Sequence, residues 1–236
     1  MLNAVLFDFD GIIADTEPVH YRAYQEIFVP LGLGFSWDAY VSRYIGLDDR
    51  EIFRRVFSAD NHDPGSEQLK LLVSIKASIF QDIVLSGVEA YPGVVELIGD
   101  LSGKVPLALC SGAVRSDIMP ILRRFDLLDA FDAIVTADNV NVSKPDPESY
   151  RMAVRELSGV HAGRKIIPGA CLAIEDTPAG IASAKGAGIP VLAVTNSHPA
   201  EKLQDASIIV DSLRGLTLET LDNMIPVPLK YVSNCL

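Results

Sequence analysis

The chain has 236 residues, of which 49% are hydrophobic and 22% are charged, and its formal net charge is −11. This apolar content excludes a disordered or low-complexity chain, because burying it offsets the entropy cost of ordering the backbone. The acidic balance argues against nucleic acid as a partner, since binding to phosphates depends on clustered lysine and arginine.

Neither the cysteines nor the first residues point to a secreted or membrane protein. Cys110, Cys171 and Cys235 are too few and too scattered for a disulfide framework or a zinc site. The N-terminus has no basic segment, and no apolar run reaches the ~18 residues of a membrane span. We therefore expect a cytoplasmic protein without a membrane partner. The sequence does not specify an oligomeric state, and a monomer is consistent with it.

Short apolar runs alternate with amphipathic helical patterns over much of the chain. The predicted strands are 4–9, 106–110, 133–137, 171–174, 191–195 and 207–210. The predicted helices between the later strands are 94–101, 114–125, 148–157 and 179–184. This alternation predicts an α/β fold, a doubly wound, Rossmann-like parallel sheet with helices on both faces. The tail at 226–236 indicates only a sheet edge or a loose end.

Between the first two strands, residues 17–88 contain helical patterns and no convincing strand. The predicted helices are 19–28, 38–44, 49–57 and 67–85. The segment's own core is expected to contain Trp37 and most of Phe28, Phe53, Phe57 and Phe80. A small helical-bundle domain, 16–91, is therefore predicted as an insert in an α/β domain made of 1–15 and 92–236.

Acidic residues follow two of the predicted strands, at the sheet edge where open α/β proteins bind ligands. Asp8 interrupts an apolar strand, where an unpaired carboxylate would be costly, and Asp10 comes two residues later. Glu175 and Asp176 follow the strand at 171–174, although Asp176 could instead cap the next helix. Carboxylates without histidine or cysteine among them favour Mg²⁺ over zinc.

Other residues at this edge could hold an anion. Lys144 precedes the rigid Pro145 and could bind a carboxylate and a substrate phosphate, unless it is a solvated loop lysine. Ser111 and Gly112 lie where a strand gives way to a helix, so they offer a hydroxyl and backbone N–H groups, or a plain turn.

The acidic residues and the anion-binding residues at this sheet edge together predict phosphoryl transfer. Asp8 would attack phosphorus and form an aspartyl-phosphate, and Asp10 would act as general acid and then as general base. Mg²⁺ and Lys144 would screen the charge that otherwise keeps a phosphate dianion away from a carboxylate.

The same residues resemble the four ordered motifs of the haloacid dehalogenase-like hydrolase superfamily. The matching segments are Asp8-Phe-Asp-Gly-Ile-Ile-Ala-Asp-Thr-Glu17, Ser111, Lys144-Pro145 and Glu175-Asp176. The helical insert resembles the cap of the β-phosphoglucomutase-like branch. The resemblance implies Mg²⁺ on Asp8, on the backbone carbonyl of Asp10 and on Asp176, with Glu175 as an indirect partner. It also implies that Ser111 and Lys144 hold the phosphate.

We expect a Mg²⁺-dependent phosphatase that acts on a small phosphorylated metabolite such as a sugar phosphate. The alternative is a sugar phosphomutase of the β-phosphoglucomutase type. Similar mutases have a Lys-Gly pair and a nearby arginine in a cap loop. Here Ile45 precedes Gly46, and Asp49 replaces the arginine unless Arg50 substitutes for it. His20 matches a cap histidine of both groups, so His20, Gly46 and Arg50 are candidate substrate contacts.

Two other classes fit the residues less well. A phosphoacceptor signalling domain also uses acids, a hydroxyl and a lysine at strand ends. Such domains are much shorter, place the phosphoacceptor later in the chain and have no helical insert. A cysteine-dependent phosphatase is suggested by Cys110 and Arg115, but the four residues between them are one fewer than that phosphate loop needs.

Overall fold

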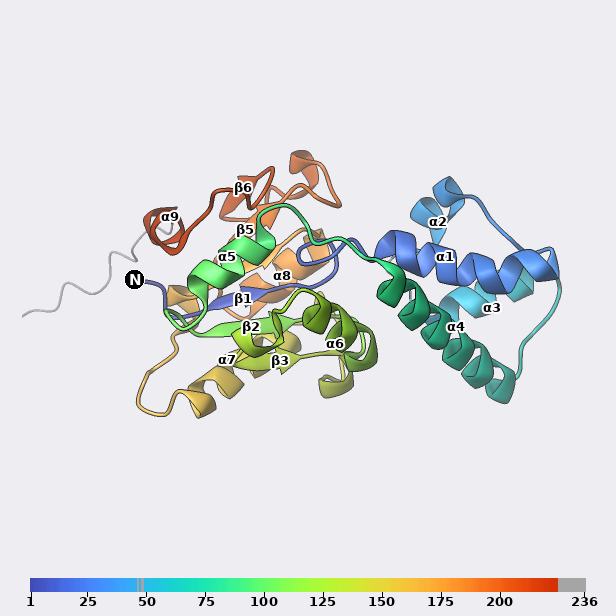
Figure 1. Ribbon diagram of the computed structural model, residues 1–236, viewed down its shortest axis with the longest axis horizontal. Coiled ribbons are helices and arrows are strands. Elements are labelled where there is room, and N and C mark those ends of the chain that lie inside the picture. The colour runs from blue at the N-terminus through green and yellow to red at the C-terminus, as the bar shows by residue number, and fades with distance from the viewer. Residues whose placement is uncertain (46, 48, 225–236) are drawn as a thin grey trace, which may run out of the picture. The chain divides into compact units, whose positions relative to one another are not determined.

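The computed structural model describes residues 1–45, 47 and 49–224 (Figure 1). The described residues form two compact units, one made of residues 1–14 and 90–224, and the other lying within Asp15–Glu89. The predicted tail at 226–236 and Cys235 lie outside the described residues. The described part of the chain holds no helix whose length and hydropathy would let it span a bilayer.

The first unit is built on a six-stranded parallel sheet. Its strands are β1 Val5–Phe7, β2 Leu107–Cys110, β3 Ala133–Val135, β4 Leu172–Glu175, β5 Val191–Val194 and β6 Ile208–Val210. The strand order is β3-β2-β1-β4-β5-β6, so β1 lies in the middle of the sheet between β2 and β4. These central strands are buried on both faces, which explains why they are apolar along their whole length.

Helices cover both faces of this sheet. They are α5 Val94–Leu101, α6 Arg115–Arg124, α7 Glu148–Val160, α8 Pro178–Gly186 and α9 Leu218–Met224. Helices α7 and α8 pack on one face, where Ala153 and Ile181 meet Leu6 and Cys110 of the strands. Helix α5 lies in front of the strands in Figure 1, on the opposite face, and contacts α9. The predicted doubly wound α/β class is confirmed.

Helix α9 does not appear among the predicted helices. It has seven residues and buries only Leu221 among them, so the sequence shows no repeating apolar face. Every other predicted helix and strand is present, with ends that differ from the predicted ones by a few residues.

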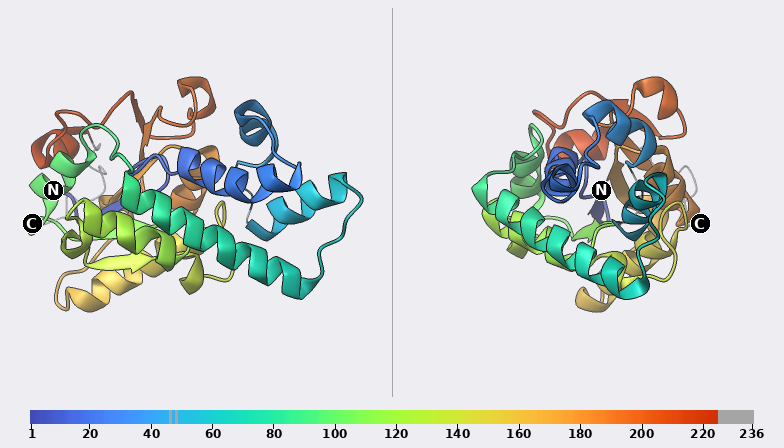
Figure 2. Two further views of the ribbon diagram at one scale, coloured as in Figure 1. Left: turned by 45° about the vertical axis from the view of Figure 1, so that its right-hand side comes forward. Right: turned by 90° about the vertical axis from the view of Figure 1, so that its right-hand side faces the viewer.

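The second unit is the predicted helical bundle inserted after β1. Its helices are α1 Glu17–Phe28, α2 Trp37–Arg43, α3 Asp49–Ala59 and α4 Ser66–Ser86. Helices α1 and α4 run side by side (Figure 2). Its core is aromatic: the Phe28 ring centroid lies 5.4 Å from that of Phe53 and 5.8 Å from that of Phe57. Such pairs stabilise a small core beyond the area that they bury.

The prediction that Trp37 belongs to this core is wrong. Its side chain is 39% exposed and meets the edge of the Tyr21 ring, with the centroids 5.2 Å apart. Trp37 is the first residue of α2, directly after the Ser36 N-cap, so it lies at the rim of the bundle. Phe80 is buried, but it stacks on the imidazole of His20.

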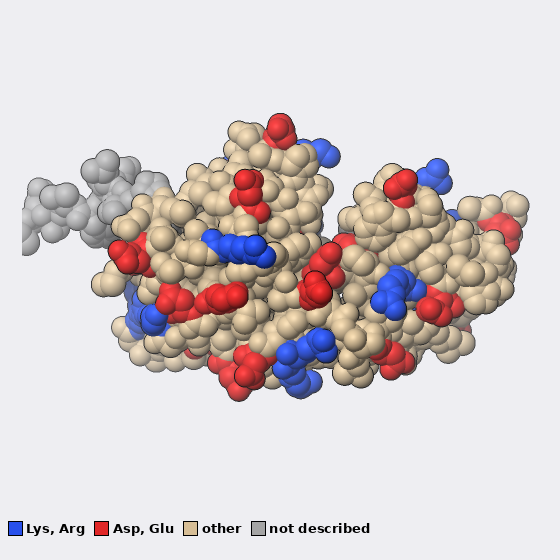
Figure 3. Space-filling model, turned by 45° about the horizontal axis from the view of Figure 1, so that its top comes forward, with Lys and Arg blue, Asp and Glu red and all other residues tan. Residues whose placement is uncertain are grey.

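Acidic and basic side chains are intermixed on the face of the molecule that Figure 3 shows. No continuous basic surface is visible there among the residues drawn in colour. This agrees with the excess of acidic over basic residues in the sequence, 31 against 20.

Candidate active site

The predicted catalytic carboxylates meet at the carboxyl ends of β1 and β4. Phe7 and Ile174 are paired in the sheet, and the N–H of Asp8 donates to the carbonyl of Ile174 over 2.9 Å. This register places Asp8, the residue after β1, beside Glu175, the last residue of β4. The parallel pairing of two buried strands therefore brings together acids that are far apart in the sequence.

Lys144 bridges these two carboxylates. Its Nζ lies 2.8 Å from Asp8 Oδ1 and 2.6 Å from Glu175 Oε1. The lysine side chain is only 12% exposed, so the alternative of a solvated loop lysine is excluded. Short charge-assisted hydrogen bonds of this kind are among the strongest in proteins.

Glu175 is fully buried and uses both of its carboxylate oxygens. Oε1 also accepts the hydroxyl of Tyr150 over 2.8 Å, and Oε2 accepts the N–H of Asp176 and the hydroxyl of Thr177. A Cβ on Gly180 would lie 2.0 Å from this carboxylate, so only glycine fits there. The sequence analysis did not single out Tyr150 or Gly180, because both lie at core positions of helices.

Asp176 differs from Glu175 in forming no ion pair within the described residues. Both Oδ atoms are buried without a hydrogen bond of standard geometry, and the side chain of Ser197 only partly opposes the rise in the pKa of this carboxyl. Gly11 follows β1 with a φ of 81°, and a Cβ there would lie 1.9 Å from Asp176 Oδ2. Burial, and then the charge of Glu175, raises the pKa of Asp176 to about 7. An isolated buried carboxylate is costly, so this position requires a cation or a proton.

These acids fit a divalent cation. Asp8, Glu175 and Asp176 each offer a carboxylate oxygen, and the three atoms lie within 4.8 Å of one another. The donors are all oxygen, which suits Mg²⁺. Asp10 is half-buried in the turn after β1, where its backbone pairs with Ala14.

The electrostatic balance of the site also calls for added positive charge. Burial, and then the charge of Glu175, raises the pKa of Asp8 well above its usual value, although Lys144 opposes the shift. Burial by itself would lower the pKa of Lys144, but Asp8 and Glu175 raise it above its usual value. Lys144 is therefore a permanent cation, and one lysine does not neutralise three buried acids.

Ser111 and Gly112 lie at the same edge of the sheet, after β2. The N–H of Ser111 donates to Val135, and its Oγ accepts the N–H of Ala113 over 2.9 Å. Ser111 is buried, Gly112 is exposed, and α6 begins three residues later at Arg115. The Ser111 hydroxyl can still donate its hydrogen to an anion.

The candidate substrate contacts belong to the helical insert. His20 Nδ1 lies 2.7 Å from Lys76 Nζ, and Lys76 is buried and forms an ion pair with Asp49 over 2.9 Å. Burial, and then the charge of Lys76, lowers the pKa of His20 well below its usual value, so the imidazole is neutral. Arg50 is exposed in the first turn of α3, and Gly46 lies outside the described residues.

Two alternatives from the sequence are settled by these contacts. Thr177, not Asp176, is the N-cap of α8, because its side chain accepts the N–H of Gly180 over 3.0 Å. Cys110 is fully buried, and burial raises the pKa of its thiol far above the usual value. A buried neutral thiol is a poor nucleophile, so a cysteine-dependent phosphatase is excluded.

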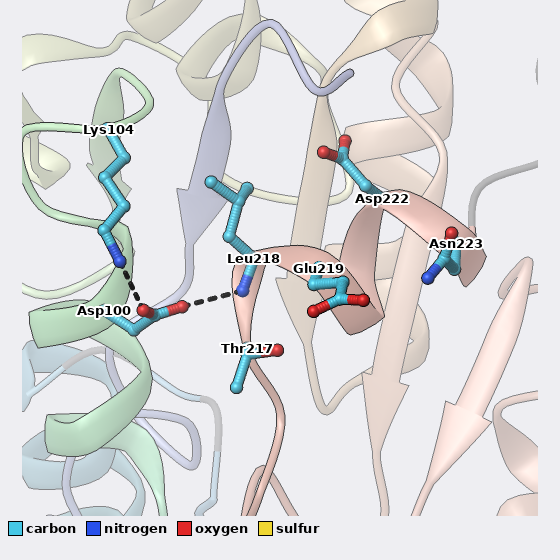
Figure 4. Close-up of a pocket in the computed structure, with 7 residues that line it drawn as sticks. All are labelled: Asp100, Lys104, Thr217, Leu218, Glu219, Asp222 and Asn223. Carbon is cyan, nitrogen blue, oxygen red and sulfur yellow. Dashed lines mark hydrogen bonds and ion pairs between the residues drawn. The ribbon is translucent and has the colours of Figure 1, made fainter.

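A separate hollow of about 610 Å³ lies between α5 and α9 (Figure 4). Asp100 joins the two helices there, since it accepts hydrogen bonds from Lys104 Nζ and from the N–H of Leu218. None of the predicted catalytic residues lines this hollow.

The site combines a buried aspartate after the central strand with an acidic pair at the end of the neighbouring strand. A lysine bridges the aspartate to the first acid of that pair, and this arrangement is typical of one class of hydrolases. Residues 5–194 match the family of haloacid dehalogenase-like hydrolases. The chain belongs to this family, and the resemblance to its β-phosphoglucomutase-like branch is confirmed.

Several characterised proteins are similar over most of the chain. The phosphorylated carbohydrates phosphatase of Thermotoga maritima is 30% identical over 190 residues, which cover 80% of this chain and 82% of the relative. The β-phosphoglucomutase of Bacillus subtilis is 29% identical over 226 residues, with 93% and 94% covered. A crystal structure of a mutant of CbbY from Rhodobacter sphaeroides, in complex with xylulose-(1,5)bisphosphate, has a TM-score of 0.81 at 27% identity, with 94% of this chain and 99% of that chain covered.

Proposed function

We propose that the protein is a Mg²⁺-dependent phosphatase that hydrolyses a small phosphorylated sugar. The observation that carries the proposal is the contact of Lys144 with both Asp8 and Glu175, beside the buried carboxylate of Asp176, for which the described residues offer no ion pair. A buried carboxylate with a permanent cation at 2.8 Å and a cation site next to it is suited to attack an anionic phosphoryl group.

In this proposal Asp8 and Asp10 perform the chemistry. Asp8 Oδ forms a bond to phosphorus while the bond from phosphorus to the ester oxygen breaks, and Asp10 gives its proton to that oxygen. Asp10 then takes a proton from a water molecule, which attacks the aspartyl-phosphate, so inorganic phosphate leaves and Asp8 is restored. Lys144, Ser111 and the backbone around Gly112 hold the phosphoryl oxygens during both steps.

Asp8 and Asp176 would hold Mg²⁺ directly together with the backbone carbonyl of Asp10, and Glu175 would support them. When bound, the ion supplies charge neutralisation for the phosphate dianion and for the nucleophile. Choice among leaving groups is assigned to His20, Gly46 and Arg50 of the insert, as the family resemblance implies.

A sugar phosphomutase is the second candidate, because the β-phosphoglucomutase of Bacillus subtilis matches almost the whole chain. The insert favours the phosphatase. Asp49 stands where similar mutases have an arginine, and it forms an ion pair with Lys76 over 2.9 Å. An acid that neutralises a buried lysine lowers the positive charge that a second phosphate group would require.

A phosphate-release screen over sugar, nucleoside and short-chain phosphates, with and without EDTA, tests the proposal. We expect release of inorganic phosphate from one or more sugar phosphates, and its loss in EDTA. β-Glucose 1-phosphate with a trace of the bisphosphate serves as the second arm. Isomerisation without phosphate release there would favour the mutase, and no turnover in either arm would contradict both.

A further inference from the structure

Tyr150 lies beneath the candidate site and contacts both partners of its central ion pair. Its hydroxyl donates to Glu175 Oε1 over 2.8 Å, and Lys144 Nζ lies 5.2 Å from the centroid of its ring. Tyr150 and Glu175 are both fully buried. The hydroxyl and the ring therefore each act on a charge of the site in a buried environment, where such contacts are stronger than in water.

Glu175 Oε1 therefore accepts two hydrogen bonds of similar length, from Lys144 Nζ at 2.6 Å and from Tyr150 at 2.8 Å. Lys144 Nζ in turn is shared between that oxygen and Asp8 Oδ1 at 2.8 Å. A tyrosine hydroxyl carries its hydrogen at neutral pH, so it remains a donor to this carboxylate. The tyrosine hydroxyl thus supplies one of the two hydrogen bonds to Oε1. Without it, this oxygen would interact with Lys144 alone.

We propose that Tyr150 is a positioning residue, whose hydroxyl limits the pull of Glu175 on Lys144 and so keeps the ammonium group within reach of Asp8 and of the phosphoryl group. The inference rests on the proposed function for its effect on turnover, but its effect on the position of Lys144 can be measured separately. The loss of the hydroxyl leaves Oε1 with one donor fewer in a buried site. Lys144 then moves toward Glu175 and away from Asp8.

The first experiment compares Tyr150→Phe with the wild type in steady-state kinetics on a sugar phosphate that the screen has identified. We expect kcat to fall about tenfold and KM to change less than twofold, since the ammonium group matters most as charge moves in the transition state. Tyr21→Phe is the matched control. It also loses one tyrosine hydrogen bond, from its hydroxyl to the carbonyl of Phe35, and we expect its kcat to be unchanged.

A double-mutant cycle with Glu175→Gln separates positioning from a general loss of packing. If Tyr150 acts through Glu175, Tyr150→Phe causes less than a twofold further loss in the Glu175→Gln background. An equal tenfold loss in both backgrounds would overturn the proposal, as would a kcat of Tyr150→Phe within twofold of the wild type. A Tyr150→Phe chain that does not fold would also overturn it, because the proposal requires the ring to suffice for packing.

A crystal structure of Tyr150→Phe tests the inference independently of turnover. We expect the distance from Lys144 Nζ to Asp8 Oδ1 to exceed hydrogen-bond range, while the contact with Glu175 is kept. If Lys144 stays on Asp8 the proposal is wrong, whatever the enzyme hydrolyses. If the lysine moves but the wild type releases no phosphate from any ester, the positioning role stands and the proposed function fails.

Discussion

Asp8 combines three properties that a phosphoryl acceptor needs. It is buried, its Oδ1 lies 2.8 Å from a lysine that remains charged, and a candidate cation site adjoins it. Burial, and then the charge of Glu175, raises the pKa of this carboxyl, so the proposed nucleophile would depend on nearby cations to stay ionised. In the proposed mechanism the lysine and a bound ion would therefore support the nucleophile as well as phosphate binding.

We expect Asp8→Asn to abolish phosphate release while the fold is kept. Asparagine has the same shape but cannot form the phosphorylated intermediate, and it removes a charge that the buried site disfavours. Phosphate release and Tm measured side by side test this, and Tm should equal or exceed that of the wild type. Turnover that survives in the folded variant would show that another residue is the nucleophile.

At the scale of elements, the junction between β4 and α8 shapes the acidic site. Thr177 caps the helix, Pro178 begins it, and Gly180 in its first turn faces the carboxylate of Glu175. The helix can begin directly beside a buried charged group only because a small residue lies there.

Gly180→Ala is expected to lower the free energy of unfolding by about 1–3 kcal/mol, because overpacking a core displaces its neighbours. The added Cβ would meet the Glu175 carboxylate at 2.0 Å, so kcat should fall as well. Gly159→Ala is the control, since a Cβ in that position of α7 meets nothing within 4 Å. It should leave kcat unchanged and stabilise the helix by about 0.5–1 kcal/mol. Urea unfolding and steady-state kinetics of the two variants measure both effects. Equal changes in unfolding free energy and in kcat for the two variants would show that the close approach of Gly180 to Glu175 has no special role.

Helices α1 and α4 are joined in the insert by the contact of His20 with Lys76. Burial, and then the charge of Lys76, holds the pKa of His20 in the folded chain well below the usual 6.5. Below pH 6.5 the unfolded chain therefore binds a proton that the folded chain does not bind, and the folded state loses stability as pH falls.

We expect the wild type to lose up to about 1.4 kcal/mol per pH unit below this point through His20 alone. His20→Gln should remove that part of the pH dependence, whereas His62→Gln should keep it, because His62 is exposed on the same unit. Urea unfolding at pH 7.5 and 5.5 provides the comparison. An equal loss of stability between pH 7.5 and pH 5.5 in the wild type and in His20→Gln would contradict a neutral His20 imidazole in the folded chain.

The sequence predicts elements better than it predicts contacts. The apolar strands and the acids that follow them determine the sheet edge, so Asp8, Lys144 and Glu175 could be expected together before any distance was known. Tyr150 could not, since an aromatic residue three positions before Ala153 has the spacing of a core residue whether or not its hydroxyl has a role. Trp37 shows the opposite error, because a large apolar residue at a helix end can remain at the surface.

At the scale of the whole molecule, binding of Mg²⁺ should be linked to folding and to pH. The pKa of Asp176 is about 7 in the folded chain, against 3.8 for an unperturbed aspartate. Between about pH 4 and pH 7 the metal-free folded state therefore binds a proton that the unfolded state has lost. Stability of the metal-free chain therefore falls as pH rises from about 4 to 7, and Mg²⁺ has to displace the proton below pH 7.

We expect the Mg²⁺-dependent gain in unfolding free energy to be about 1.4 kcal/mol larger at pH 8 than at pH 6, which is a tenfold difference in affinity. Chemical unfolding with and without Mg²⁺ at the two pH values measures it. Asp176→Asn should abolish both the gain and its pH dependence. A gain of the same size at both pH values would show that Asp176 does not hold the ion.

The central place of β1 in the sheet has a consequence for biosynthesis. β1, which precedes the proposed nucleophile, is the first of the six described strands to leave the ribosome, but its two neighbours begin only at Leu107 and Leu172. The contiguous segment from Asp15 to Glu89, with its own aromatic core, is complete before either neighbour is made. The nascent chain can therefore fold its inserted bundle while β1 is still unpaired, and catalytic competence arises only late in translation.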